Sequence, residues 1–188
     1  MSVGRLAARA VIGGLFIGHG TQKLFGWFGG PGRAGTEGMM ESLQLRPAKV
    51  HATLAGVTET AGGAMLVAGL GTPLAAAGLT GVMTTAITKV HLPNGPWAAN
   101  GGWEYNAVLI AALAALVETG PGALSLDHYL DRERKGSLWA LTAVAAGVGA
   151  AFATMAAGQA GAPAPELQAV APLAAEGDAA GDPSTVGA

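Results

Sequence analysis

Five long apolar segments, separated by turns rich in glycine and proline, constrain the fold of this chain more than any other feature. The segments cover residues 6–25, 50–70, 74–90, 103–119 and 138–155. A helix needs about 20 largely apolar residues to cross a bilayer, and each segment comes close to this length. The last segment is rich in alanine, which makes it the weakest of the five. The pattern predicts an all-α fold, a polytopic membrane helix bundle with five spans.

Composition also indicates a membrane protein. Of 188 residues, 51% are hydrophobic and only 12% are charged, against about 25% charged residues in soluble domains. The net charge of -2 provides no basic surface for nucleic acid. No cysteine is present, so the chain has no thiol chemistry and no thiolate ligands for an iron–sulfur cluster. We expect a multi-pass protein of the cell membrane whose first partner is the lipid bilayer.

The segments between the predicted spans divide the chain into three regions. Region 1–130 holds the first four spans, with a short amphipathic helix expected at 36–45 and a tight turn at 70–73 that makes the flanking spans antiparallel neighbours. Pro93 is expected to end the third span, because proline lacks the donor that a helix needs. Region 131–158 holds a basic loop and the fifth span. Region 159–188 is acidic and rich in alanine, proline and glycine, which predicts a disordered tail.

Basic residues favour a cytoplasmic N-terminus. The two sides of a five-span topology carry five basic residues each. The rule that cytoplasmic loops are positive gives most weight to residues close to the first span and in short loops. Arg5, Arg9 and the cluster at 132–135 meet that condition and place the acidic tail outside.

Polar residues gather in one half of the predicted bundle. His19 and Lys23 lie four residues apart near the end of the first span and therefore share a helix face. Glu59 lies near the middle of the second span, and the residues three and four positions from it are all glycine or alanine. Small residues allow another helix to approach closely. We expect Glu59 to face the bundle, either neutral or paired with Lys23 or His19.

Three further polar residues belong to the same half, because antiparallel spans bring these segment ends together. They are His91, Glu104 and Asn106, of which the last two are also expected to cap the fourth span. Ionisable groups inside a membrane are costly and usually functional, so the six residues are candidates for ligand binding or proton relay. A structural role is the alternative for each, through hydrogen bonds between helices or a lysine stem reaching the interface. The histidine spacing matches no known ligand motif, so no metal site is expected.

Five motifs in a fixed order resemble the DoxX family over about residues 5–130. They are Gly-His-Gly-x-x-Lys-Leu-Phe-Gly at 18–26, Glu-x-x-Gly-Gly-x-x-Leu-x-x-Gly-x-x-Thr-Pro at 59–73, His91, Gly-Trp-Glu-Tyr-Asn at 102–106, and Gly-Pro-Gly-x-x-Ser-Leu-Asp at 120–127. The resemblance implies a small four-helix protein of the bacterial inner membrane. Some members of the family are linked to quinone-dependent sulfur oxidation or to membrane-associated oxidoreductase complexes. The fifth span and the tail extend beyond this four-helix core.

Two classes of function fit these features. In the first, the chain is a non-autonomous membrane subunit of a quinone-linked oxidoreductase complex, with membrane-associated redox proteins as partners and a quinone as cofactor. Quinone carbonyls need donors such as His19 or Lys23, and their reduction needs a proton source such as Glu59. In the second, the chain is a transport or scaffolding protein without redox activity, in which the same groups relay protons or bind a small solute.

Overall fold

The computed structural model describes residues 3–160, and every regular element in this range is helical. The α-helices are α1 (Val3–Phe25), α2 (Gly32–Ser42), α3 (Ala48–Ala68), α4 (Thr72–Ala86), α5 (Glu104–Thr119), α6 (Leu126–Tyr129) and α7 (Ser137–Ala160). A π-helical turn, η2 (Ile87–His91), follows α4 directly, and three short 3₁₀ turns are η1 (Trp27–Gly29), η3 (Leu92–Asn94) and η4 (Ala98–Asn100). The all-α prediction is confirmed for these residues.

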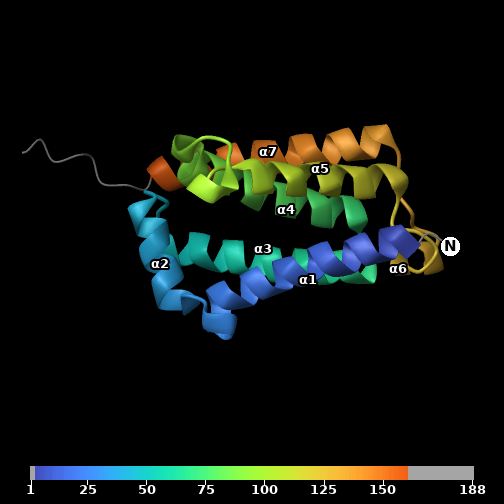
Figure 1. Ribbon diagram of the computed structural model, residues 1–188, viewed down its shortest axis with the longest axis horizontal. Helices are drawn as coiled ribbons and strands as arrows, with labels where there is room; N and C mark the ends of the chain where they lie inside the picture. Colours follow the sequence, from blue (N-terminus) through green and yellow to red (C-terminus); the bar gives the residue numbers. More distant parts are fainter. Residues whose placement is uncertain (1–2, 161–188) are drawn as a thin grey trace, which may run out of the picture.

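The five long helices form two layers (Figure 1). One layer pairs α1 with α3, and the other packs α4 against α5 and α7. Contacts between α3 and α4 join the layers. Helix α2 crosses one end of the bundle, which we call the α2 end, and α6 lies at the opposite end near the N-terminus. The tight turn between α3 and α4 makes them antiparallel neighbours, as the sequence predicts.

Glycine allows α1 and α3 to pack backbone against backbone. A Cβ at Gly13 would lie 2.6 Å from the carbonyl oxygen of Gly63, and a Cβ at Gly63 would lie 2.6 Å from that of Gly13. Further along the same pair of helices, a Cβ at Gly20 of α1 would overlap Thr60 of α3. Real Cβ atoms are excluded at such distances, so this seam requires glycine on both helices. The expectation that the small residues around Glu59 admit another helix is confirmed.

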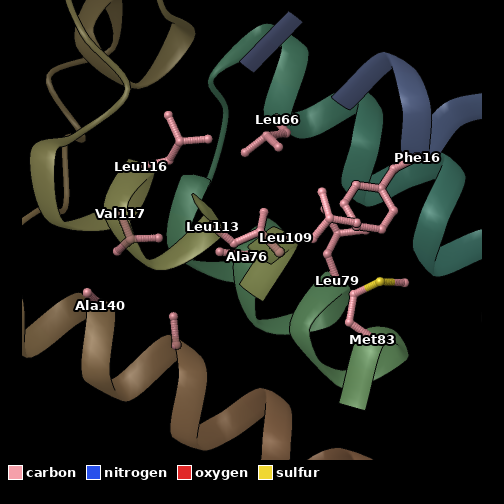
Figure 2. Close-up of a cluster of buried hydrophobic side chains, with 11 residues drawn as sticks. Phe16, Leu66, Ala76, Leu79, Met83, Leu109, Leu113, Leu116, Val117 and Ala140 are labelled. Atoms are coloured by element: carbon pink, nitrogen blue, oxygen red, sulfur yellow. The ribbon is translucent and has the colours of Figure 1, made fainter. Parts of the chain in front are cut away.

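The main hydrophobic core lies between the layers in the half of the bundle away from α2. Phe16 and Leu66 from the α1–α3 layer meet Leu79, Leu109 and other residues of α4, α5 and α7 there (Figure 2). A second, smaller cluster lies at the α2 end and comprises Met40, Leu45, Ala52, Ala151 and Met155. The two cores hold the layers together at the two ends and leave space between them.

The observed helices follow the predicted spans, but the span that was expected to be the weakest is the most suited to a membrane. The alanine-rich α7 is the one helix within residues 3–160 that is long and apolar enough to cross a membrane by length and composition. Its ranking as the weakest span was wrong, because 24 uncharged residues outweigh its alanine content. By comparison, α4 and α5 have 15 and 16 residues, and α1 carries Arg5, Arg9 and Lys23.

The predicted boundaries differ from the observed ones at two places. The third span does not end before Pro93 but continues through η2 and η3 to Asn94. Proline at position 93 clashes with the carbonyl four residues earlier, and the wider π-helical turn accommodates such disruption. Helix α7 extends through Gln159 and Ala160, and the rest of the predicted tail lies outside the described residues.

Candidate functional site

A cavity of about 900 Å³ lies between the two layers, toward the α2 end. Its walls come from α1, α2, α3, α4, α5 and α7 and are mostly apolar. Leu15 and Leu54, which line it, are about half exposed at the molecular surface, so the cavity opens sideways between helices. Cavities of this size with mostly apolar walls are typical of sites that bind small molecules.

An ion pair within the α1–α3 layer forms part of this cavity wall. Lys23 Nζ of α1 lies 2.6 Å from Glu59 Oε2 of α3. The Glu59 side chain is 3% exposed and the Lys23 side chain is 19% exposed. Of the two partners that the sequence offered for Glu59, Lys23 is the one that it contacts. The ammonium has three N–H groups and makes one hydrogen bond within residues 3–160, so it retains donor capacity toward the cavity.

Three histidines line the same cavity. His19 Nδ1 lies 3.1 Å from Gln22 Oε1, and His91 Nδ1 lies 2.7 Å from the carbonyl oxygen of Gly101. Since an oxygen acceptor at Nδ1 requires the proton there, Nε2 of each neutral ring is left as an acceptor. His51, which the sequence analysis did not select, is buried and has Nε2 3.3 Å from the Arg46 carbonyl oxygen.

The remaining two candidates have different positions. Asn106 lines the cavity, is buried, and donates from Nδ2 to the sulfur of Met83 at 3.3 Å. Glu104 is not among the cavity-lining residues. Its Oε1 accepts a hydrogen bond from the Ala98 backbone N–H at 2.7 Å and so fixes the loop that precedes α5. The structure brings five of the six predicted residues to one cavity. The sixth, Glu104, instead binds the loop before α5.

The opposite end of the bundle buries a second charge that the sequence analysis did not assign to a site. Arg9 is 1% exposed. Its guanidinium donates to four backbone carbonyls, those of Leu66, Val67, Pro121 and Leu124, at 2.6–3.0 Å. All of its donor nitrogens are engaged, so this arginine joins α1 to the end of α3 and to the loop after α5.

Asp127 completes this end of the bundle. Its Oδ1 accepts from the Gly71 backbone N–H, and its Oδ2 accepts from both the backbone N–H and the hydroxyl of Thr72. A carboxylate at this position satisfies the free N–H groups at the start of α4 and is favoured by the helix dipole. The role of Asp127 is architectural.

Among residues 3–160, no group of three His, Asp or Glu residues is placed to hold a metal ion.

Comparison with known proteins identifies a domain within the chain. Residues 4–92, which include both helices of the ion pair, match the family model described as DoxX. No curated protein and no solved structure matches the chain.

Proposed function

We propose that this chain is a multi-pass membrane subunit of a quinone-linked oxidoreductase complex and that its cavity binds the quinone. The match of residues 4–92 to the DoxX family model and the long apolar helix α7 support its placement in a membrane. On this proposal, 1–130 is a four-helix membrane core, and 131–160 is a fifth span with its basic loop. Its N-terminus is cytoplasmic, and membrane-associated redox proteins are its partners.

The distribution of side chains supports several membrane spans. Large apolar side chains are exposed on every long helix: Val11 and Leu15 on α1, Leu54 and Val57 on α3, Leu74 on α4, Val108 on α5, and Leu138, Leu141 and Phe152 on α7. The bundle meanwhile buries Arg9, Glu59, Asn106 and Asp127. Exposed apolar surface on this scale is unusual for a soluble monomer and suits contact with lipid.

Helix lengths and aromatic residues support the same placement. At 1.5 Å per residue, α1, α3 and α7 are about 31–36 Å long, which matches the hydrocarbon thickness of a bilayer. Exposed Trp27, Phe28 and Trp97 lie at the α2 end, and Tyr129 and Trp139 lie at the other. Aromatic residues are enriched at both membrane interfaces.

The cavity residues fit a quinone. Lys23 has a free donor for a quinone carbonyl oxygen, and the apolar walls suit a ring with an isoprenoid tail. The sideways opening at Leu15 and Leu54 gives a lipid-soluble molecule access from the bilayer. A bound quinone supplies reversible two-electron chemistry that the side chains of this chain lack.

Glu59 is the group proposed to hold and transfer the proton that this chemistry requires. Its Oε2 accepts a hydrogen bond from Lys23 Nζ, and His19 and His91 place further ring nitrogens on the cavity wall. The single observation that carries the proposal is this ion pair, set in the wall of a large apolar cavity.

Binding of a short-chain ubiquinone analogue to the detergent-purified protein tests the proposal. Wild-type protein should bind it and co-purify with endogenous quinone. Lys23→Gln should weaken binding by about tenfold to a hundredfold, because one charge-assisted hydrogen bond is lost. Glu59→Gln should abolish the pH dependence of binding or of reduction.

Glu104→Gln is the matched control, since it makes the same change outside the cavity wall. If Glu59→Gln reduces the yield of folded protein, the neutral pair Lys23→Gln/Glu59→Gln replaces it. Failure of wild-type protein to bind the analogue, or equal binding by wild type and Lys23→Gln, would overturn the quinone assignment. Uptake of a small solute by vesicles containing the protein would then favour the transport function.

A further inference from the structure

A second cavity, of about 440 Å³, lies between α4 and α7 at the end opposite α2. We call it the α4–α7 groove. Its floor is apolar and includes Leu74, Ala143 and Ala146, while Arg132, Arg134 and Trp139 form its rim. Asp127 also lines the groove. The groove therefore combines two cationic side chains and one carboxylate with apolar residues of α4 and α7.

The two rim arginines have no carboxylate partner among residues 3–160. The nearby acids are engaged elsewhere: Glu133 pairs with Lys135 at 2.8 Å and with His128 at 3.2 Å, and Asp127 holds the start of α4. Arg134 instead lies over the Trp139 ring, 5.1 Å from its centroid. This cation–π contact orients the guanidinium without using its hydrogen-bond donors.

We propose that the α4–α7 groove binds an anionic phospholipid, with the phosphate at Arg132 and Arg134 and one acyl chain along the groove. Guanidinium groups match phosphate oxygens in pairs, and basic pockets between helices at the membrane surface bind acidic lipid head groups. Trp139 lies beside these arginines, as expected for a residue at the level of the head groups. The inference rests on the proposed membrane placement. The groove shares Leu74, Ala77 and Ala146 with the wall of the larger cavity, whereas Arg132 and Arg134 line the groove alone.

The apolar walls favour a lipid over a soluble phosphate. Leu74 on α4 is 70% exposed, and Leu141 on α7 is 69% exposed. An acyl chain in the groove would cover Leu74 and remain continuous with the surrounding bilayer. A free anion would contact the arginines alone and leave this surface uncovered.

The test measures lipid retention and lipid-dependent thermal stability of the full chain in mild detergent. We expect added phosphatidylglycerol, but not phosphatidylcholine, to raise the unfolding temperature and to remain bound by native mass spectrometry. Arg132→Gln/Arg134→Gln should weaken retention of phosphatidylglycerol by about thirtyfold, about fivefold for each arginine. Thr142→Trp, which fills the groove but keeps both arginines, should also reduce retention.

Arg33→Gln/Lys49→Gln is the matched control, because it removes the same charge from exposed positions at the α2 end. Equal loss of phosphatidylglycerol in this control would overturn the site and indicate general attraction by positive charge. Stabilisation of wild type by inorganic phosphate to the same extent would overturn the lipid in favour of a soluble anion. Extraction of the protein without detergent would refute the membrane placement itself, whereas loss of lipid preference alone would refute only the groove.

Discussion

The two ends of the bundle each bury a charge, and they satisfy it in different ways. Arg9 uses four of its five N–H groups on backbone carbonyls, and each of its three nitrogens is engaged. Lys23 and Glu59 satisfy each other through one contact and line a large cavity. Burial of a charge is costly in either case. A saturated charge fixes the architecture, whereas a pair with unused hydrogen-bonding capacity is available for chemistry.

The largest effect is expected at the saturated end. Arg9→Met would remove four hydrogen bonds. The Leu66 carbonyl would keep the Gly69 N–H as a donor, but the other three would lose the guanidinium, and a buried unpaired carbonyl costs about 1–3 kcal/mol. We expect the variant to yield little monodisperse protein, since the loss approaches the total stability of a typical domain. Size-exclusion chromatography in detergent measures this yield.

Arg5→Met provides the control for this prediction. Arg5 is also on α1 and donates to the Thr119 carbonyl oxygen, but it makes fewer hydrogen bonds than Arg9. Its substitution should therefore lower the free energy of unfolding by about 1 kcal/mol. Arg9→Lys should not restore the fold, because an ammonium cannot reach carbonyls on two sides as a planar guanidinium does. Wild-type yield of Arg9→Met would show that the carbonyl network is dispensable.

A smaller loss of about 3 kcal/mol is expected for Lys23→Met, which leaves the Glu59 carboxylate without its partner. The double variant Lys23→Met/Glu59→Gln should recover most of that loss, because the uncompensated charge is then removed. Thermal or denaturant unfolding of the four proteins in one detergent gives the coupling free energy. Additive effects would show that the two residues contribute independently, and the contrast with Arg9 would then lose its basis.

The sequence predicted the ion pair but not the arginine network, and the partners explain why. The glycines and alanines around Glu59 indicate that its side chain faces another helix. Its partner Lys23 is a charged side chain, which the sequence shows directly. The partners of Arg9 are main-chain carbonyls 57–115 residues away. Any residue supplies a carbonyl, so no side-chain pattern marks such a site before the fold is known.

The same limit applies to the motif at 120–127 and to the cavity. The sequence identified Gly120-Pro121-Gly122 as part of a family resemblance. Only the fold shows that this loop presents carbonyls to Arg9 and a carboxylate to α4. Likewise, His51 of α3 lines the cavity and lies beside the Arg46 carbonyl oxygen of the loop after α2, a contact that helix periodicity does not predict.

An intermediate effect is expected for Asp127→Asn. The amide keeps one acceptor oxygen but loses the second and the charge, so the start of α4 loses part of its cap. A loss of about 0.5–2 kcal/mol in the free energy of unfolding is expected. Asp131→Asn, at an exposed neighbouring position, should change it little. Equal effects of the two substitutions would show that Asp127 contributes only through general charge.

The smallest effect is expected at Glu133, which pairs with Lys135 and His128 on the surface near the Arg9 end. The hydrogen bond from Lys135 Nζ lowers the pKa of Glu133 below its ordinary value of 4.5. The native state therefore binds this proton less readily than the unfolded state, so the stabilisation is complete above pH 4.5 and is lost as the pH falls below it. Glu133→Gln should flatten the dependence of unfolding temperature on pH only in this acidic range and leave it unchanged near neutrality. A difference of the same size at pH 7 and pH 3 would show that Glu133 acts through packing rather than charge, and the contrast between buried and exposed ion pairs in this chain would need revision.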